Sequence, residues 1–306
     1  MTTHEPSRSS DADPVHLPVL VEEVVALIAP RQDGCYVDGT LGLGGHTAAL
    51  LEAGAGRVIA LDRDEDAIAV ARERLGARSS RVTFVHEDYR QLPAVLAREG
   101  VAGVDGIVVD LGVSSMQLDT ASRGFSFRQA GPLDMRMDRS KGATLQDRIA
   151  ATDETTLADV IWRFGEERRA RRVARAVVEA QDRGELTDTL ALASVVRRAA
   201  GSGSWERIDP ATRTFQALRI WVNGELDGLD TFVEDAAGRL RKDGRLAVLA
   251  FHSLEDRVVK HTMRRLATPA TEYRLVQRRA IVASDAERAT NPRARSARLR
   301  GLVRVA

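Results

Sequence analysis

Residues 36–47, which read Y-V-D-G-T-L-G-L-G-G-H-T, have the composition of a ligand-binding turn. Two apolar residues lead into Asp38, and four glycines follow within seven positions. Glycine adopts positive φ without strain, so Gly42, Gly44 and Gly45 let a cofactor lie close to the main chain. Free N–H groups at the start of the following helix add hydrogen-bond donors. The stretch therefore predicts a strand, a tight turn and a helix N-terminus that together bind a cofactor.

The glycines alone do not identify the ligand, because a dinucleotide-binding fold uses the same device for a pyrophosphate. The dinucleotide fingerprint has a third glycine three residues after Gly44, and this chain has Thr47 there. An acid at the strand end, such as Asp38, is instead typical of S-adenosylmethionine sites. A nicotinamide-dependent oxidoreductase is the rival enzyme class, disfavoured by the missing glycine and by the lack of a Tyr-x-x-x-Lys pair. A non-catalytic RNA-binding protein is the third alternative.

Acidic residues follow four predicted strands. Because ligands of parallel sheets bind beyond the carboxyl ends of the strands, we expect these acids to surround one crevice. Asp62 lies 20 positions after Gly42, where an acid accepts hydrogen bonds from both ribose hydroxyls of an adenosine. The alternative role of Asp62 is to cap the next helix, which Asp64 fills better. The four acids are Asp38, Asp62, Asp88 and Asp110.

Asp110, at the end of the fourth predicted strand, is the candidate catalytic residue. Methyl transfer to an exocyclic amine needs an oxygen that holds the N–H and takes up the developing positive charge. Asp110 can do this with help from the backbone carbonyl of Leu111; its alternative role is to cap the following turn.

Tyr89 either packs on an adenine ring or belongs to the edge of the core. Ser114, Ser115 and Gln117 can orient the substrate or contact the cofactor, although turn formation is the simpler role of the serines.

The elements that position these residues alternate in the first part of the chain. Short apolar runs predict strands at residues 35–37, 57–61, 82–86 and 106–110, with helices between them. This alternation indicates an α/β fold with a parallel sheet and right-handed crossovers. Residues 245–251 resume the sheet, and residues 273–282 and 299–305 predict a hairpin around a long polar loop.

The alternation stops at residues 111–141, a loop rich in glycine, serine and charge. Such a long loop inside a compact domain is usually functional or a linker. Residues 144–200 then read as consecutive helices without a strand, so we predict a helical insertion, and G-S-G-S at residues 201–204 marks its end. Helices are predicted at residues 16–29, 91–98, 145–150, 154–164, 166–181, 189–199, 213–226, 231–240 and 254–266.

Composition limits the class of protein. The chain has 306 residues, 45 basic and 44 acidic side chains and a net charge of +1, so any basic surface must be local. The single cysteine, Cys35, excludes an internal disulfide and a cysteine-based zinc cluster, and the six histidines show no metal-ligand spacing. The first residues form no apolar signal segment and no run reaches membrane-spanning length. We expect a cytoplasmic protein that does not bind membranes, with a disordered tail at residues 1–13.

Two arginine clusters are candidate nucleic-acid contacts. The first lies on one predicted helix, where Glu166 and Glu167 partly neutralise it, and a solvated helix face is the usual meaning of such a run. The second has no acid nearby in sequence after Glu287, so it is the favoured nucleic-acid contact. His252 and Ser253, at the end of the fifth predicted strand, are expected to form the wall of the crevice. The clusters are Arg168, Arg169, Arg171, Arg172 and Arg175, and Arg293, Arg295, Arg298 and Arg300.

Linked motifs between residues 16 and 300 make the chain resemble the RsmH (MraW) family of bacterial enzymes, which methylate N4 of a cytidine in the decoding region of 16S ribosomal RNA. The resemblance implies a Rossmann-like class I methyltransferase with a mostly parallel seven-stranded sheet, S-adenosyl-L-methionine as donor and the small ribosomal subunit as partner. It implies a methyltransferase domain at residues 14–125 and 212–306 and a helical substrate-recognition insertion at residues 126–211. The motifs are H-L-P-V-L, D-G-T-L-G-L-G-G-H-T, L-D-R-D, D-L-G-V-S-S-M-Q-L-D, R-G-F-S-F, G-P-L-D-M-R-M-D, A-T-R-T-F-Q-A-L-R-I-W-V-N, F-H-S-L-E-D-R and N-P-R-A-R-S-A-R-L-R.

The resemblance also implies roles for single residues. Asp110 is implied to be catalytic, and no metal ligand is implied. Tyr89 replaces the Phe expected there and keeps the ring. The Pro-Pro-aromatic element of other amino-methyltransferases is missing after Asp110, so the base-stacking ring is open among Phe125, Phe127 and Trp221. The chain leaves open whether the protein is a monomer or a homodimer. The implied cofactor-binding residues are Gly44, Gly45, His46, Asp62, Tyr89, Asp110 and Gln117.

Overall fold

A computed structural model describes residues 18–201 and 209–306. The predicted tail at residues 1–13, the start of the first predicted helix and residues 202–204 of the G-S-G-S segment lie outside this range. Within it, a single sheet contains seven strands. They are β1 (Cys35–Asp38), β2 (Arg57–Asp62), β3 (Val82–His86), β4 (Val104–Asp110), β5 (Leu240–Ala250), β6 (Tyr273–Leu275) and β7 (Arg298–Arg304).

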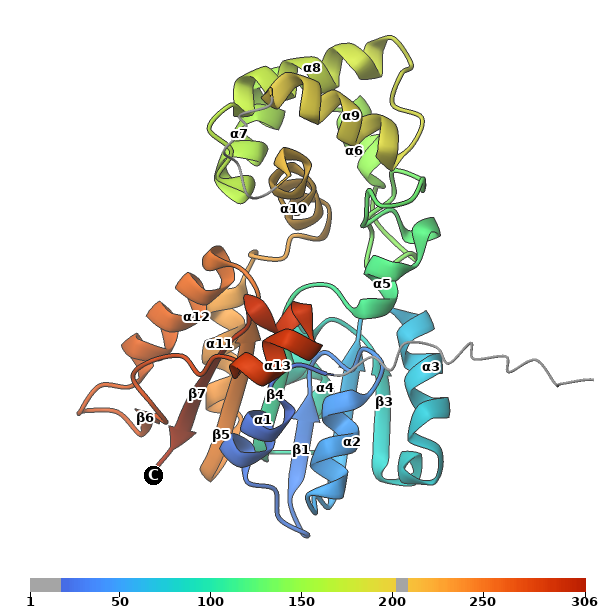
Figure 1. Ribbon diagram of the computed structural model, residues 1–306. Helices are drawn as coiled ribbons and strands as arrows, with labels where there is room; N and C mark the ends of the chain where they lie inside the picture. The colour runs from blue at the N-terminus through green and yellow to red at the C-terminus, as the bar shows by residue number, and fades with distance from the viewer. Residues whose placement is uncertain (1–17, 202–208) are drawn as a thin grey trace, which may run out of the picture.

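The strand order is β3-β2-β1-β4-β5-β7-β6, which is Rossmann-like (Figure 1). The pairs from β3 to β5 are parallel, and β7 runs antiparallel between β5 and β6. The prediction of a mostly parallel seven-stranded sheet is therefore confirmed. The chain order reverses between β1 and β4, and a crevice forms at such a point beyond the carboxyl ends of the strands.

Helices cover both faces of the sheet and form a separate bundle (Figure 1). The α-helices of the described residues are α1 (Val21–Ile28), α2 (Gly45–Glu52), α3 (Glu65–Leu75), α4 (Leu92–Arg98), α5 (Ser115–Asp119), α6 (Leu145–Ala150), α7 (Glu154–Gly165), α8 (Ala170–Asp182), α9 (Thr189–Ala200), α10 (Pro210–Asn223), α11 (Leu229–Gly238), α12 (Ser253–Leu266) and α13 (Asp285–Thr290). Single 3-10 turns are η1 (Gly76–Arg81), η2 (Tyr89–Gln91), η3 (Ala121–Arg123) and η4 (Pro292–Arg295). None of these helices is long and apolar enough to cross a membrane.

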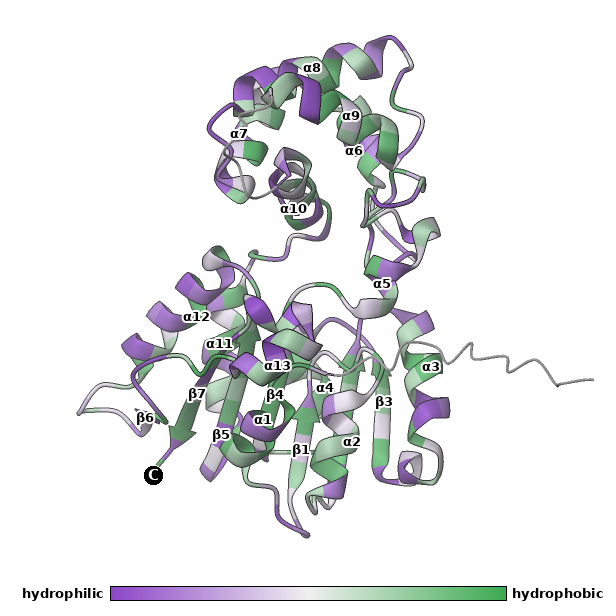
Figure 2. Ribbon diagram, in the orientation of Figure 1, coloured by the Kyte–Doolittle hydropathy of each residue, from purple (hydrophilic) through white to green (hydrophobic). Residues whose placement is uncertain are grey.

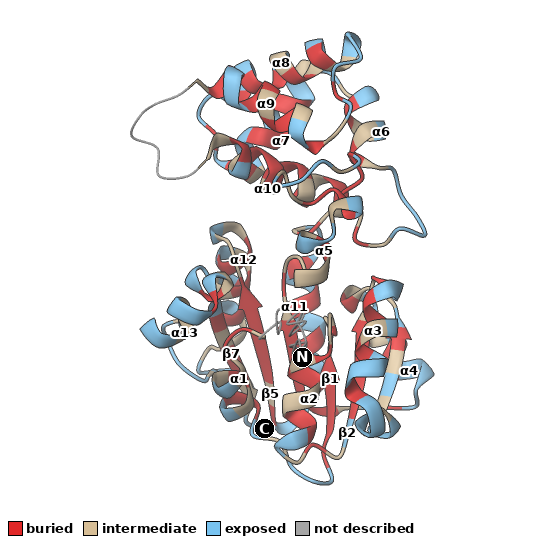
Figure 3. Cartoon of the chain, turned by 45° about the vertical axis from the view of Figure 1, so that its right-hand side comes forward, coloured by how far each residue is buried: buried red, intermediate tan, exposed pale blue. Residues whose placement is uncertain are grey.

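Side chains of the central strands alternate between two hydrophobic cores. Val37 and Ile107 pack in the core that α4, α11 and α12 complete. Tyr36 and Val108 pack on the other face, in the core that α1, α2 and α3 complete. Strands β1 and β4 are buried almost throughout, and apart from Asp38, Asp105 and Asp110 their residues are apolar or glycine. The strands of the sheet are coloured largely hydrophobic in Figure 2 and largely buried in Figure 3. Burial on two faces explains why these segments read as continuous apolar runs in the sequence.

A third hydrophobic core lies in the helical bundle formed by α6 to α10. The bundle stands above the carboxyl ends of the strands in the view of Figure 1. Its core extends from Phe125 to Val222 and includes Phe215 and Leu218 of α10. Helix α10 therefore packs with the preceding helices, and the boundary expected at residue 212 falls inside it. We propose that the bundle and the sheet with its covering helices form separate structural units.

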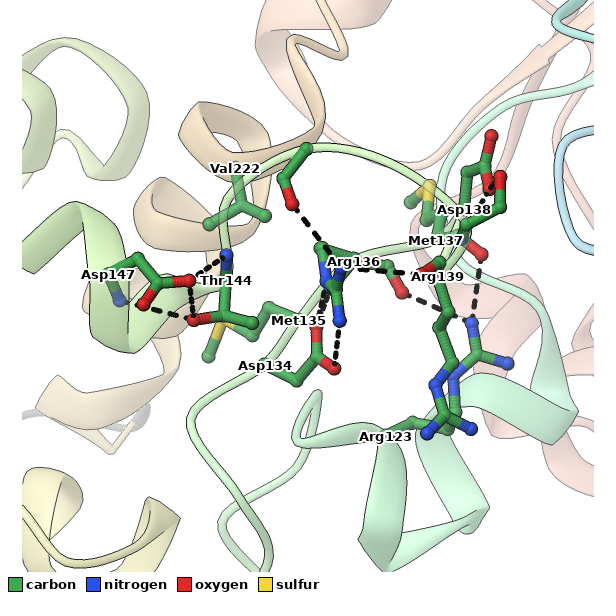
Figure 4. Close-up of polar contacts among 12 residues, drawn as sticks. Arg123, Asp134, Met135, Arg136, Met137, Asp138, Arg139, Thr144, Asp147 and Val222 are labelled. Atoms are coloured by element: carbon green, nitrogen blue, oxygen red, sulfur yellow. Dashed lines mark hydrogen bonds and ion pairs between the residues drawn. The ribbon is translucent and has the colours of Figure 1, made fainter.

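Polar contacts join the bundle to the sheet. Arg123 donates from Nη1 to Asp64 Oδ2 at 2.7 Å, and both side chains are only 3% exposed. Its Nη2 donates to the carbonyl of Met137 at 2.9 Å, a contact visible in Figure 4. Asn223, at the end of α10, accepts from the Met137 N–H and donates to the Met135 carbonyl, each at 2.8 Å. The loop after β4 is therefore a braced connection and not a loose linker.

Some predicted element boundaries are wrong, with local causes. Helix α8 begins at Ala170 and not at residue 166, because Glu166 adopts the left-handed conformation (φ 51°) that ends α7. The predicted strand at residues 273–282 is reduced to β6 and an isolated bridge at Ile281. The polar loop after it contains α13, which begins where Ser284 accepts a hydrogen bond from the Glu287 N–H. The hairpin pairing of β6 with β7 is confirmed.

Candidate functional site

A cavity of about 380 Å³ lies beyond the carboxyl ends of β1, β2 and β4, between the sheet and α10. This volume is in the range of small-molecule sites. Of the seven residues expected to bind the cofactor, six line the cavity, and Gly44 does not. Their roles stay predictions. The six are Gly45, His46, Asp62, Tyr89, Asp110 and Gln117.

Two glycines allow the turn before α2 to form. Gly44 precedes the helix with φ 81°, in the left-handed region that favours glycine. A Cβ on Gly44 would lie 3.4 Å from Cβ of Ala71, so this residue faces α3 and not the cavity. A Cβ on Gly45 would lie 2.7 Å from Cγ of Pro18, closer than real side chains approach. The chain thus needs glycine here for conformation and for close packing.

The expectation that four strand-end acids surround the crevice is wrong for two of them. Asp38 is fully buried and outside the cavity wall, because it accepts hydrogen bonds from the Thr40 N–H at 3.1 Å and the Thr47 hydroxyl at 2.7 Å. Asp88 is also outside the wall and pairs with Arg90 through contacts of 2.9 and 2.7 Å. Burial raises the pKa of Asp88, but the neighbouring arginines outweigh burial and hold the pKa below its usual value. These two acids stabilise the loops, and the other two face the cavity.

Asp62 is one of the two acids in the wall. Its oxygens accept hydrogen bonds from the Gly42 N–H at 2.7 Å and the Asp64 N–H at 2.9 Å. Burial nevertheless raises the pKa of Asp62 from 3.8 to about 6. Asp64 occupies the N-cap of α3 as predicted, but its carboxylate does not cap the helix. The carboxylate accepts hydrogen bonds instead from Gln117 at 2.8 Å and from Arg123. A buried guanidinium without a counter-charge would destabilise the fold more than a helix end without a side-chain cap does.

Asp110 and His46 form the other acidic part of the wall. The Asp110 N–H donates to the Thr40 hydroxyl at 2.6 Å, and Oδ2 lies 3.5 Å from Nε2 of His46. Burial lowers the pKa of His46, but the carboxylates of Asp110 and Asp38 outweigh it and raise the pKa above its ordinary value. Among the described residues, Asp110 Oδ1 and both His46 ring nitrogens lack hydrogen-bond partners. Such buried polar atoms are groups that an ordered water, an ion or a ligand can satisfy.

Tyr89 and Gln117 both line the cavity and also make structural contacts. Tyr89 lines the cavity and also packs edge-to-face on Phe232, with ring centroids 4.6 Å apart. Gln117 lines the cavity too, but its side chain forms a capping box with Ser114 and donates to Asp64. Gln117 therefore fixes the start of α5 as well as lining the cavity.

The far end of the cavity, which we call the α10–α12 end, was missed by sequence reasoning except for His252. Arg219 donates from Nε and Nη2 to the two oxygens of Glu225, at 2.9 and 2.8 Å. His252 lines the cavity as expected, and its Nε2 lies 3.2 Å from Oε1 of Glu255. Ser253 does not line the cavity, contrary to expectation. The signal was present in the motifs containing Arg219 and Glu255, but nothing local showed that these side chains meet. The α10–α12 end consists of Gln216, Arg219, Glu225, Phe251, His252 and Glu255.

Glu225, His252 and Glu255 offer ligand atoms within 4.8 Å of one another, close enough to hold a cation. Arg219, however, occupies both oxygens of Glu225. Glu255 Oε2 also accepts the Phe251 N–H at 3.0 Å. The carboxylates are therefore compensated by protein groups, and the cluster is a polar wall rather than a metal centre.

The three rings considered for base stacking lie away from the cavity. Phe125, Phe127 and Trp221 all pack in the core of the bundle. Phe127 contacts Phe215 edge-to-face at 4.8 Å, and the Arg148 guanidinium lies 5.4 Å from the Trp221 ring. None of the three belongs to the cavity wall. Their role in base stacking stays a prediction, and it would require the RNA to contact them outside this cavity.

The C-terminal arginine cluster is only partly free for RNA. Arg300 donates to Asp256 at 2.6 and 3.1 Å, and Arg293 donates to Asp119 at 2.7 Å. These acids come from α12 and α5, so the absence of an acid nearby in sequence was misleading. Arg298 is exposed, but its Nη1 also lies 3.8 Å from Asp256 Oδ2. Arg295 is exposed, as are Arg168, Arg171 and Arg172 at the bundle.

Comparisons with known proteins agree with this geometry. The sequence profile of the MraW methylase family matches residues 13–305. A protein named ribosomal RNA small subunit methyltransferase H, from Sorangium cellulosum, is 51% identical over 290 residues, which is 95% of this chain and 91% of the relative. Its namesake from Rhodopseudomonas palustris is 49% identical over 307 residues, covering 96% and 92%. An alignment with the structure of an rRNA methylase from Streptococcus thermophilus covers 94% of this chain and 98% of that chain. The sequence identity is 11% and the TM-score is 0.44, which is a weak structural similarity.

Proposed function

The chain belongs to the MraW methylase family, and we propose that it methylates the exocyclic N4 amine of a cytidine in the decoding region of 16S ribosomal RNA. Its methyl donor is S-adenosylmethionine. Relatives that share about half of its residues carry the name ribosomal RNA small subunit methyltransferase H, which supports a small-subunit RNA substrate. Membership of a methylase family argues against the nicotinamide-dependent oxidoreductase. We place the reaction in the cytoplasm, where the small subunit is assembled.

The wall residues fit the donor. Asp62 keeps lone pairs free for a ribose diol after accepting two backbone N–H groups. The Gly45 main chain faces the cavity at the start of α2, where N–H groups lack partners within the helix. The ring of Tyr89 offers an apolar face beside η2. The bound donor supplies an electrophilic methyl group on a positively charged sulfur, and the carboxylates of the wall complement that charge.

Asp110 is the proposed catalytic residue. Its side chain is 26% exposed and lines the cavity, so the carboxylate can accept the N–H of the substrate amine, which orients the nitrogen lone pair. As the nitrogen bonds to the methyl group it becomes positive, and the carboxylate stabilises this charge. Asp110 then accepts the proton that the amine releases. Thr40, which binds the Asp110 N–H, and His46, beside Oδ2, hold this carboxylate in place.

The partly exposed carboxylate of Asp110 in the cavity wall is the observation that carries this proposal. The test incubates small subunits from a strain lacking the gene with enzyme and S-adenosylmethionine, then maps methylcytidine by mass spectrometry of the 16S RNA. We expect Asp110→Asn to bind S-adenosylmethionine in calorimetry and to lose about 10²- to 10⁴-fold in rate. Asp159→Asn, at an exposed acid on α7, is the matched control. Transfer at the wild-type rate by Asp110→Asn, or binding of NAD in place of S-adenosylmethionine, would refute the proposal.

A further inference from the structure

The cavity extends from the glycine loop past Asp110 and Gly112 to the α10–α12 end. The groups suited to the donor lie at the glycine loop, Asp62 and Tyr89, so this end is left for the acceptor. We propose that the α10–α12 end is a nucleobase subsite in which Phe251 is the stacking ring and Arg219 is the hydrogen-bond donor that selects the base. The proposal rests on the proposed function and names the residues that recognise its substrate.

Phe251 is placed next to the catalytic acid by the sheet. Strands β4 and β5 are parallel neighbours, and Asp110 pairs in register with Leu249. Phe251 follows two residues later, at the same edge of the sheet and level with Gly112. A Cβ on Gly112 would lie 3.8 Å from Cδ2 of Phe251, in van der Waals contact with the ring. Because residue 112 is a glycine, no side chain stands there between the ring and the cavity.

Phe251 is also the best available platform by elimination. Among the described residues, the only Phe, Tyr or Trp side chains in the cavity wall are Tyr89 and Phe251. Tyr89 is 5% exposed and is held edge-on by Phe232 at the opposite end of the cavity. Phe251 is only partly buried. A base taken out of its stack needs a flat apolar face, and Phe251 offers it beside the carboxylate that receives the amine.

Arg219 supplies a fixed cation in the same wall. Glu225 holds Nε and Nη2 in a bidentate pair, and the two side chains are 15% and 4% exposed. Within the part of the chain that the structure describes, Nη1 donates no hydrogen bond. A guanidinium donates and cannot accept, so this group recognises an acceptor atom on the ligand. Glu225 restricts its motion and thereby fixes the direction of the donor.

This arrangement distinguishes bases by the atom next to the amine. Cytosine places the ring acceptor N3 beside the N4 amine, so it can offer the amine to Asp110 and N3 to Arg219. Uracil carries an N–H at the same ring position and an oxygen in place of the amine. That N–H would face the guanidinium donor, and the oxygen would face the carboxylate. Both contacts would be repulsive, because two donors would face each other at Arg219 and two acceptors at Asp110. The subsite therefore rejects uracil by mismatched hydrogen-bonding groups and not by its size.

The first test removes the ring. We expect Phe251→Leu to keep its affinity for S-adenosylmethionine in calorimetry and to lose roughly 10- to 100-fold in kcat/KM for small subunits. Phe251→Tyr, which keeps the ring, should recover most of that loss. Phe84→Leu removes an aromatic side chain of β3 that lies outside the cavity and stacks with Arg72, so it is the matched control. Wild-type kcat/KM in Phe251→Leu would overturn the stacking assignment.

The second test removes one atom from the substrate and does not depend on the folding of a single variant. Small subunits are reconstituted with 16S RNA that carries cytidine or 3-deazacytidine at the methylated position. The wild-type enzyme should lose about tenfold or more on 3-deazacytidine, while the double variant Arg219→Leu, Glu225→Leu should treat the two substrates alike. Equal rates of the wild-type enzyme on the two substrates would overturn the assignment of Arg219. If the wild-type enzyme methylates no cytidine in 16S RNA, the proposed function itself fails, and that result is separate from either outcome above.

Discussion

Asp62 makes the affinity for the donor depend on pH. Burial raises its pKa from 3.8 to about 6, so half of the ligand-free protein carries a neutral acid at that pH. A ribose diol donates two hydrogen bonds, which the ionised carboxylate accepts far better than the protonated one. Binding therefore favours the ionised form. The affinity should be at its maximum above pH 6 and should fall as the pH drops through this value.

The magnitude follows from the ionised fraction. With a pKa of about 6, Asp62 is almost fully ionised at pH 7.5 and roughly one tenth ionised at pH 5. The association constant for S-adenosylmethionine should thus fall about tenfold, or about 1.4 kcal/mol, between these two values. At pH 5.5, binding should release roughly 0.8 proton from Asp62, measurable as a difference in calorimetric enthalpy between buffers of different ionisation enthalpy.

The control is Asp62→Asn, which cannot ionise but keeps the shape of the side chain. It should bind about 10- to 100-fold more weakly at pH 7.5, because it loses a charged hydrogen-bond acceptor. Between pH 7.5 and 5 its remaining pH dependence reports other groups such as His46, and subtracting it isolates Asp62. A wild-type affinity that is flat over this range, or a tenfold fall that persists in Asp62→Asn, would refute the assignment of Asp62 to the ribose.

Three further predictions concern stability and RNA binding. Arg123→Met should lower the free energy of unfolding, measured by urea titration, by about 3–5 kcal/mol, because it leaves the buried carboxylate of Asp64 without its counter-charge. The control Arg163→Met removes an exposed ion pair and should change the free energy of unfolding by less than about 0.5 kcal/mol. Thr47→Val should cost about 1.5–3 kcal/mol through the lost hydrogen bond to buried Asp38, and Thr47→Ser should restore it; equal stability of the two variants would contradict this. Arg295→Gln should reduce the slope of log affinity against log salt for 16S RNA by about one, and an unchanged slope would show that this exposed arginine makes no phosphate contact.

Much of the scaffold follows from local sequence patterns. The strand at residues 82–86 and the helix at residues 145–150 were predicted to the residue. Strands buried on both faces must be apolar throughout, and helices with one buried face must repeat every three to four residues, so both leave a signal in any short window. Boundaries failed where a single residue changed the backbone direction, as Glu166 does with its positive φ. The proposed division into two units rests instead on which helices share a core.

The sequence by itself determined the glycine turn, the alternation of strands and helices around it and the placement of Asp62 and Asp110 at the ends of strands. Only the tertiary structure decided which acids stay available to a ligand. Asp38 and Asp88 follow β1 and β3 in the same way but are satisfied by Thr47 and Arg90, whereas the partly exposed carboxylate of Asp110 lines the cavity. Only the tertiary structure brings together the residues of the α10–α12 end, because α10 and α12 belong to different parts of the fold. The physical reason is that a buried charge is stabilised by whichever groups surround it in space, and those groups are often far away along the chain.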